Sequence, residues 1–343
     1  MAATIRDIRE KTGLSLATIS KYINGGNVLP ENREAIAAAI KELHYEVNEV
    51  ARGLATQQTR TIGVLIQNFD NIFAGTIVSN IERILREHNY GTIVCDCQGD
   101  KKLEEEEIHF LLGKRVDGII TIPTAGNSNY LQGALDRKIP VVLLDRAFSD
   151  DRFDSVLVDN KQAAQNAMEV LLANGHQKIG IICGDDSEFT ARERLRGYYK
   201  ALEDANIDIS MEYVKRGSLT VEHGYQAMKE FMNMKDRPTA VFLSNYEITL
   251  GGVVAVNEMG IPFPQEISLI GFDNFMLSKV VKPSLWMVSQ PMEKIAKQAA
   301  ELMLNQLRSS TDKERKPQHI MLQTSLHKGQ SIRNLTGDLH EDS

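Results

Sequence analysis

The sequence of 343 residues contains little cysteine and few aromatic residues, and it has no long apolar run. Its three cysteines, Cys95, Cys97 and Cys183, are odd in number and show no spacing typical of a disulfide framework. Because no stretch of about 18 apolar residues occurs, we expect no membrane-spanning helix, and the N-terminus has no apolar segment of a secretory signal. We therefore predict a cytoplasmic protein in which the two neighbouring thiols are strand residues rather than metal ligands.

Motifs of several enzyme classes are also absent. The sequence has neither a G-x-x-x-x-G-K-[ST] phosphate loop nor a G-x-S-x-G nucleophile elbow. Its eight histidines are scattered and form no pair at metal-ligand spacing. We predict that the protein is not an enzyme and uses neither a metal nor a cofactor; turnover of a bound ligand would support the alternative.

Charge is distributed unevenly along the chain, whose net charge is −7. Residues 1–60 carry eight basic and seven acidic groups, a net charge of +1, so the remaining 283 residues carry −8. A slightly positive N-terminal region on an acidic body is compatible with nucleic-acid binding but does not establish it. The acidic run Glu104–Glu107 is interpreted as the solvated start of a helix, where the helix dipole favours negative charge.

Three short helices are predicted in the first sixty residues. The segment Thr4-Ile-Arg-Asp7 has the form of a capping box, and Gly13 should end the helix that follows it. Ser15 can cap a second helix, and Pro30 is a favourable first-turn residue for a third. Apolar residues recur at helical spacing in these helices, namely Ile5, Ile8, Ile19, Tyr22, Ile23, Ile36, Ile40 and Leu43. Short helices joined by a tight glycine turn form a helix-turn-helix unit.

The second helix has a short, polar side opposite its apolar stripe. A helix that enters the major groove of DNA needs small side chains, so that its backbone approaches the base edges, together with hydroxyl, amide and cationic groups. The residues that meet this demand are Ala17, Thr18, Ser20, Lys21 and Asn24, with Leu16 beside them. A solvated face on a small helical cap is an equally good explanation of this side alone.

The string T-I-R-D-I…G-L-S-L-A-T-I-S-K-Y-I-N-G resembles the DNA-binding headpiece of the lactose-repressor (LacI/GalR) family. The likeness continues through R-E-A-I…L-H-Y-E-V-N-E-V-A-R-G-L-A-T and covers about sixty residues in one register. The resemblance implies that the second helix reads the major groove with Leu16, Ala17, Thr18, Ser20 and Lys21. It further implies that helix support and phosphate contacts come from Thr4, Ser15, Asn24, Tyr45 and Asn48. Leu29 departs from the pattern, because the family usually has a capping serine there.

Residues 48–56, NEVARGLAT, resemble the hinge helix of the same family. Asn48 can cap it, but two turns containing Gly53 are marginal in water, so it should order only against a partner hinge and DNA. The resemblance implies that Leu54 is an apolar wedge between base steps in the minor groove, with Arg52 along that groove. The alternative is a flexible linker whose Leu54 packs on the neighbouring domain.

From residue 61 onward, apolar runs alternate with amphipathic stretches. The predicted strands are Ile62–Ile66, Thr92–Cys95, Gly118–Ile122, Val141–Leu144, Ile179–Cys183, Ala240–Leu243 and Ser268–Ile270. The stretches of helical pattern between them include Ile77–Glu87, Ala163–Leu172, Arg192–Asp204 and Gly251–Met259. Continuous apolar strands separated by helices indicate parallel sheets covered on both faces.

We therefore predict an α/β fold with an N-terminal all-α helix-turn-helix headpiece and a two-lobed, doubly wound core that resembles type I periplasmic-binding proteins. The predicted boundaries are 1–47 for the headpiece, 48–60 for the hinge helix and linker, 61–333 for the effector-binding and dimerisation core, and 334–343 for a disordered tail. Within the core, we expect lobe 1 at about 61–153 plus 285–330 and lobe 2 at about 154–284.

Ligands of open α/β sheets bind beyond the carboxyl ends of the strands, here between the two lobes. The polar and aromatic residues at those ends are Asn68, Phe73, Asp145, Arg146, Asp185, Asn245 and Asp273. Such a set suits a ligand with many hydroxyl groups, and the resemblance assigns effector contacts to Phe73, Asp145, Arg194, Asn245 and Asp273. Alternatively, Asp273 caps the following helix, and Arg194 pairs with Glu193 or Glu188 on the surface.

Together these features predict a homodimeric transcriptional regulator, a repressor, that binds double-stranded operator DNA and a small, sugar-like effector. The runner-up interpretation is a sugar-binding or chemoreceptor-like module without a DNA function. The headpiece argues against that interpretation.

Overall fold

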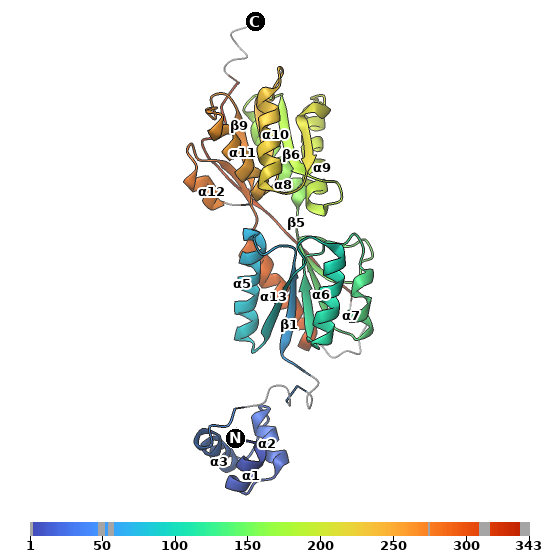
Figure 1. The fold of residues 1–343 in the computed structure, drawn as a ribbon, viewed down its shortest axis with the longest axis vertical. Helices are drawn as coiled ribbons and strands as arrows, with labels where there is room; N and C mark the ends of the chain where they lie inside the picture. Colours follow the sequence, from blue (N-terminus) through green and yellow to red (C-terminus); the bar gives the residue numbers. More distant parts are fainter. Residues whose placement is uncertain (1–2, 47–51, 54–57, 274, 309–315, 337–343) are drawn as a thin grey trace.

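The computed structural model describes residues 3–46, 52–53, 58–273, 275–308 and 316–336. Three bodies lie one after another along the longest axis of the molecule: a small helical headpiece (residues 3–46) and two α/β lobes (Figure 1). This arrangement confirms the predicted fold class.

The headpiece contains helices α1 (Ile5–Thr12), α2 (Leu16–Ile23) and α3 (Pro30–Glu42). They enclose a core whose fully or almost fully buried members are Ile8, Ile19, Ile36 and Ala39. The predicted caps are present as well. The Asp7 carboxylate accepts the Thr4 backbone N–H at 2.7 Å and its hydroxyl at 2.9 Å, and Gly13 ends α1 at φ 70°.

Lobe 1 is built on a six-stranded parallel sheet in the order β11-β5-β4-β3-β1-β2. Its strands are β1 (Thr61–Ile66), β2 (Gly91–Asp96), β3 (Gly118–Thr121), β4 (Val141–Leu144), β5 (Asp154–Val158) and β11 (His319–Leu322). Helices α5 (Ile72–Glu87) and α13 (Met292–Arg308) pack on one face of the sheet. Helix α6 (Lys101–Gly113) and the short segment η1 and α7 (Asn129–Asp136) cover the other face.

Lobe 2 repeats this plan with a sheet in the order β12-β10-β9-β8-β6-β7, in which β12 alone runs antiparallel to its neighbour. Its strands are β6 (Ile179–Gly184), β7 (Val214–Gly217), β8 (Ala240–Leu243), β9 (Ser268–Phe272), β10 (Trp286–Ser289) and β12 (Ser325–His327). Helices α8 (Asn160–Ala173) and α9 (Phe189–Asp204) share a core with one face, and α10 (Val221–Asn233) and α11 (Tyr246–Glu258) with the other. The short helix α12 (Phe275–Val280) follows β9.

The strand pairing corrects the expected boundary between the lobes. We expected lobe 2 to begin at 154, but β5 pairs with β4 and β11, so lobe 1 continues to Val158. We also expected residues 285–330 to return to lobe 1, yet β10 and β12 belong to the lobe 2 sheet. The chain therefore passes between the lobes three times, after β5, β10 and β11. The apolar run at β5 is one more strand of the first sheet rather than the start of a new unit.

Glu104 corrects the interpretation of the acidic run at the start of α6. Its side chain is fully buried and accepts the backbone N–H groups of Thr124 and Ala125 at 2.9 and 2.7 Å and the Tyr130 hydroxyl at 2.7 Å. Desolvation raises the pKa of this carboxyl, although these donors act in the opposite direction. Glu104 thus holds the loop after β3, while its three acidic neighbours lie at partly or fully exposed positions.

Helices α10 and α11 touch backbone to backbone, which makes Gly251 a sensitive position. A Cβ atom on Gly251 would lie 2.0 Å from the carbonyl oxygen of Val221. We expect Gly251→Ala to lower the free energy of unfolding by about 1–3 kcal/mol, because the helices must separate. Urea unfolding followed by circular dichroism measures this loss. The matched control is Gly75→Ala in α5, where a Cβ meets nothing within 4 Å. We expect the stability of this control to be unchanged or higher. A Gly251→Ala variant as stable as the wild type would contradict the tight contact.

No helix in the described ranges is long and apolar enough to cross a membrane.

Candidate functional site

The polar side of α2 is turned toward solvent, as the sequence predicted. Leu16, Ala17, Lys21 and Asn24 are exposed, whereas Ile19 between them is fully buried in the headpiece core. The remaining predicted readers are half-buried and hold local hydrogen bonds. Ser20 Oγ accepts from Asn24 Nδ2 at 3.2 Å, and the Thr18 hydroxyl lies 2.9 Å from Ser15 Oγ, which also accepts the Thr18 N–H. The side chains on this face are mostly short, and the helix backbone can approach a flat partner closely.

The supporting positions of the headpiece are placed as follows. Thr4 caps α1, and Tyr45 packs against the headpiece core. Leu29 stands at the N-cap of α3 without a side-chain cap bond and is 62% exposed. Arg52 is half-buried. The two other hinge positions that the sequence singles out, Asn48 and Leu54, lie outside the described residues.

A second candidate site is a cleft of about 400 Å³ between the two lobes. It lies at the carboxyl ends of strands of both sheets, as expected for open α/β folds. All six effector-site residues predicted from the sequence line it: Phe73, Asp145, Arg146, Arg194, Asn245 and Asp273. Lobe 1 supplies the first three, from the start of α5 and the end of β4, and lobe 2 supplies the others, from α9 and the ends of β8 and β9.

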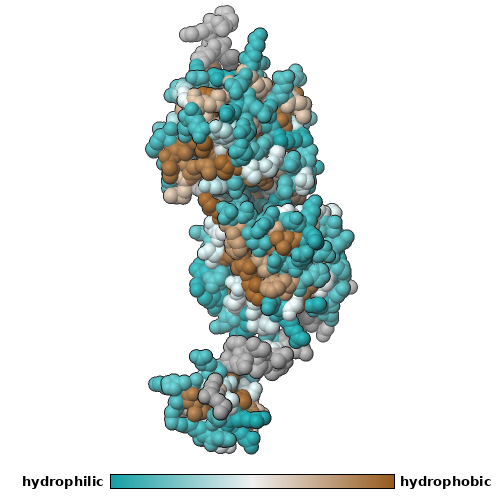
Figure 2. Space-filling model, viewed as in Figure 1, coloured by the Kyte–Doolittle hydropathy of each residue, from teal (hydrophilic) through white to brown (hydrophobic). Residues whose placement is uncertain are grey.

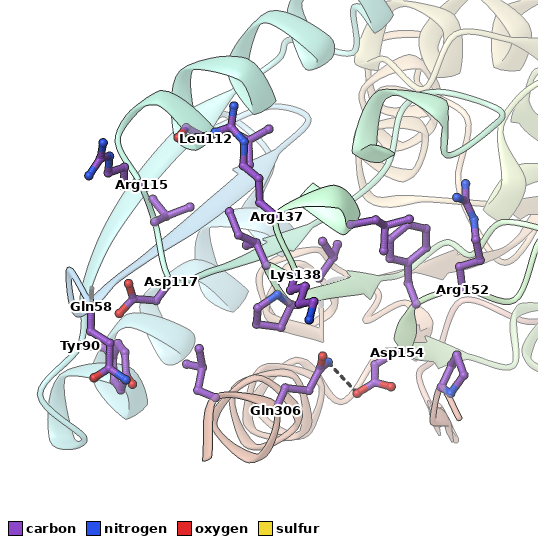
Figure 3. A pocket seen from close by; sticks show the side chains of 18 of the residues that line it. Gln58, Tyr90, Leu112, Arg115, Asp117, Arg137, Lys138, Arg152, Asp154 and Gln306 are labelled. Atoms are coloured by element: carbon purple, nitrogen blue, oxygen red, sulfur yellow. Dashed lines mark hydrogen bonds between the residues drawn. The ribbon is translucent and has the colours of Figure 1, made fainter. Parts of the chain in front are cut away.

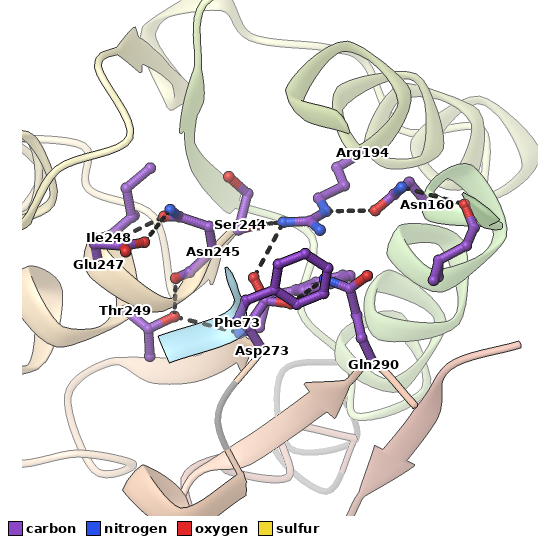
Figure 4. A network of polar contacts seen from close by, with 12 residues as sticks. Phe73, Asn160, Arg194, Ser244, Asn245, Glu247, Ile248, Thr249, Asp273 and Gln290 are labelled. Carbon is purple, nitrogen blue, oxygen red and sulfur yellow. Dashed lines mark hydrogen bonds and ion pairs between the residues drawn. The ribbon is translucent and has the colours of Figure 1, made fainter. Parts of the chain in front are cut away.

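Arg194 is the most strongly fixed of these side chains (Figure 4). Its guanidinium donates to Asn160 Oδ1 at 2.8 Å and to the carbonyl of Ser244 at 2.6 Å, and it lies 3.6 Å from an Asp273 oxygen. It also stacks over the Phe272 ring, 3.7 Å from the centroid. The two alternatives considered from the sequence are not its partners, because Glu193 pairs with Arg196 and Glu188 with Arg146.

Asp273 and Asp145 both adopt left-handed backbone conformations, with φ of 84° and 60°. Such conformations are strained for residues with a side chain and persist where the surroundings enforce them. The Asp273 carboxylate is held by Arg194 and by Gln290 Nε2, which donates at 2.5 Å. The contrast with Asp145 is clear: its Oδ1 atom is buried and accepts no hydrogen bond within the described part of the chain.

The charge of Asp145 responds to two opposing influences. Burial raises the pKa of its carboxyl above the ordinary value, while the nearby charges of Arg146 and Arg194 act in the opposite direction. A buried carboxylate oxygen without a donor is costly. A ligand that donates a hydrogen bond to this atom would remove that cost.

Among the described residues, two side-chain bridges join the lobes across the cleft, and the sequence analysis predicted neither. Arg146 of lobe 1 forms an ion pair with Glu188 of lobe 2 at 2.5 Å. Asn71 of lobe 1 donates to Glu247 of lobe 2 at 2.9 Å, and Asn245 donates to the other oxygen of that carboxylate at 2.6 Å. Their only sequence signal is that Asn71, Glu188 and Glu247 stand at helix starts after strands.

Gln67 connects the first bridge to the interior of lobe 1. Its Oε1 accepts from Arg146 at 2.9 Å, and its Nε2 donates to the Thr124 hydroxyl at 2.9 Å. Thr124 belongs to the loop that buried Glu104 holds. The guanidinium of Arg146 is therefore positioned from both lobes.

A larger cavity of about 690 Å³ opens at the other end of lobe 1, near the amino ends of its strands (Figure 3). Its carboxylates are already engaged: Asp117 accepts the backbone N–H groups of Thr59 and Arg60, each at 2.8 Å, and Asp154 accepts Gln306 Nε2 at 2.8 Å. None of the predicted site residues that the structure describes lines it. The smaller interlobe cleft, with its unpaired buried carboxylate oxygen, is the better ligand site.

No group of three His, Cys, Asp or Glu side chains in the described ranges is arranged to hold a metal ion.

A helix-turn-helix headpiece joined to a two-lobed core with a polar cleft defines a ligand-responsive DNA-binding regulator. Comparison with known families agrees. Residues 4–48 match the model of bacterial regulatory proteins of the lacI family, and residues 59–329 match that of periplasmic binding proteins and the sugar binding domain of the LacI family.

Individual proteins are similar over almost the whole chain. The transcriptional repressor PurR of Yersinia enterocolitica is 33% identical over 334 residues, 96% of this chain and 97% of its own. The lac repressor dimer bound to operator and the anti-inducer ONPF has a TM-score of 0.85 at 25% identity, covering 97% of this chain and 100% of that one. The complex of the regulator CelR with cellobiose has a TM-score of 0.72 at 25% identity, covering 96% and 99%.

The chain belongs to the lacI family of bacterial regulatory proteins. It is a DNA-binding transcriptional regulator with an effector-binding core, and not an enzyme, as the sequence predicted.

Proposed function

We propose that the protein is a homodimeric repressor that binds a pseudo-palindromic operator and changes its operator affinity when a hydroxyl-rich, sugar-like effector occupies the interlobe cleft. The observation that carries the effector site is the gathering of six predicted polar and aromatic side chains in one cleft, with a buried Asp145 oxygen that lacks a donor. The cellobiose complex of CelR supports a sugar as the ligand class.

In the proposed complex, α2 lies in the major groove. The residues that contact base edges are Leu16, Ala17, Thr18, Ser20 and Lys21. The residues that support the helix or hold DNA phosphates are Thr4, Ser15, Asn24, Tyr45 and Asn48. The exposure of the α2 side chains supports this docking. Arg52 and Leu54 act in the minor groove at the operator centre.

Dimerisation is supported by the surface of lobe 2. Figure 2 displays an apolar patch over α12, where Met276 is 62% and Val280 is 77% exposed. Contiguous exposed apolar side chains of this kind mark interaction surfaces, and the related lac repressor is a dimer. A second copy of this chain is the proposed occupant of the patch.

Effector control follows from the position of the cleft between the lobes. In the proposed complex, the ligand contacts Phe73 and Asp145 on lobe 1 and Arg194 and Asp273 on lobe 2. It therefore favours one relative orientation of the two lobes over others. Since lobe 1 carries the headpiece, that preference changes the spacing of two headpieces in a dimer and thereby the population bound to DNA.

The test starts with selection of duplexes from a random pool by the purified protein at physiological ionic strength. We expect enrichment of one pseudo-palindromic sequence, because specific contacts survive salt better than phosphate contacts alone. A thermal-shift screen of sugars, sugar phosphates and purines should then identify a ligand that raises the melting temperature and shifts the dissociation constant for that duplex. Failure to enrich any sequence would contradict the function.

The hinge role has its own test. We expect Leu54→Ala to weaken binding to the selected duplex about tenfold, because alanine cannot fill an opened base step. Fluorescence anisotropy measures both this affinity and the affinity for a random duplex, which should change little. Unchanged binding to the selected duplex would remove Leu54 from the interface.

A further inference from the structure

The interlobe cleft carries a surplus of negative charge. Among its described lining residues are five carboxylates, Asp145, Asp185, Glu188, Glu247 and Asp273, and two cations, Arg146 and Arg194. The formal charge of the lining is therefore −3. An anionic ligand in a partly desolvated site of this sign is repelled more strongly than it would be in water.

Both cations of the cleft already have partners. Arg194 is held by Asn160, Ser244 and Asp273. The Nη2 atom of Arg146 lies between Gln67 Oε1, at 2.9 Å, and Glu188 Oε2, at 2.5 Å. A phosphate or carboxylate group that pairs with Nη2 of Arg146 or with Nη1 of Arg194 must displace a protein carboxylate, which then loses that partner.

The unpaired buried atoms of the cleft are mainly acceptors. Asp145 Oδ1 and Gln290 Oε1 accept no hydrogen bond, and on the donor side Nε of Arg146 lacks a partner, all within the described part of the lining. Hydroxyl and amine groups can donate to such acceptors, whereas phosphate and carboxylate oxygens cannot.

We propose that the effector site selects against negative charge: its ligand presents hydroxyl or amine donors and carries no phosphate or carboxylate group, and Glu188 contributes to this choice by pairing with Nη2 of Arg146. The inference rests on the proposed function, since it assumes that the cleft is the effector site. Glu188 is thus a specificity-determining residue that joins lobe 2 to lobe 1.

The experiment compares matched probes by isothermal titration: neutral mono- and disaccharides, their amino derivatives, and the corresponding phosphates and uronates. For each ring that binds the wild type, we expect the anionic member to bind at least about tenfold more weakly than the neutral member. We call the dissociation constant of the anionic member divided by that of the neutral member the selectivity ratio. In Glu188→Gln the selectivity ratio should fall about fivefold or more, because the amide no longer neutralises Arg146.

Two further variants separate selectivity from folding. Glu247→Gln removes a carboxylate from another part of the lining, and the selectivity ratio should fall in this variant too. Glu193→Gln is the matched control, because Glu193 lies on the same helix as Arg194 but pairs with Arg196 and does not line the cleft; its ratio should equal that of the wild type. Melting temperatures verify that all three variants fold.

The outcomes discriminate between the two proposals. An anionic probe that binds the wild type as tightly as its neutral counterpart, or a ratio that Glu188→Gln leaves unchanged, overturns the charge selection and leaves the effector site intact. Failure of every probe to bind the wild type contradicts the effector site and the inference with it. A neutral or amine-bearing ligand with the expected ratios supports both.

Discussion

Arg194→Met should abolish effector binding while the protein still binds its operator. Arg194 is 4% exposed, and its guanidinium joins Asn160, the carbonyl of Ser244 and Asp273 at the wall of the cleft. Methionine fills similar space but leaves the Asp273 carboxylate without its cation. We expect a loss of about 100-fold or more in effector affinity, corresponding to about 3 kcal/mol.

Titration of the ligand found in the thermal-shift screen measures this loss, and anisotropy with the selected duplex measures the retained DNA binding. Arg196→Met is the matched control, because Arg196 lies on the same helix but is exposed and forms an ion pair with Glu193. The effector affinity of Arg194→Lys should lie between those of Arg194→Met and Arg196→Met, since a single ammonium cannot bridge three acceptors in the geometry of a guanidinium. A normal effector response in Arg194→Met would remove Arg194 from the site.

The buried strands of the core were predictable because their burial leaves a simple pattern. Val141–Leu144 and Ala240–Leu243 are continuous apolar runs, and both are buried at every position. The strands that sequence reasoning missed include β7, β11 and β12, which form edges of their sheets. An edge strand meets solvent on one side, so that its residues, such as VKRG in β7, need not be apolar.

The cleft was predictable only in part, for a related reason. Parallel strands all present their carboxyl ends at one edge, so that Asp145, Asn245 and Asp273 could be placed at the site from sequence order alone. The bridges across the cleft depend on how the lobes are oriented, which no local pattern encodes. Arg194 illustrates the limit. Its sequence neighbours on α9 include glutamates, yet its carboxylate partner is Asp273, which directly follows β9.

Ala17→Asp should reduce operator affinity about 100-fold without destabilising the headpiece. Ala17 is exposed near the start of α2, on the side opposite buried Ile19. A carboxylate at the second position of a helix is favourable for the helix itself, because it meets the positive end of the dipole. In the proposed complex, the same carboxylate would stand close to base edges and phosphates, where it repels the backbone and prevents close approach.

Anisotropy with the selected duplex at two salt concentrations measures the effect of Ala17→Asp. Ala38→Glu is the control, since it adds the same charge at an exposed position of α3 and should alter affinity less than about threefold, the range expected for a change of net charge alone. If Ala17→Asp also remained within that range, α2 would not lie in the groove. The headpiece would then contact DNA through another face, because a carboxylate on the reading helix cannot be neutral to binding when that helix lies against two phosphate backbones.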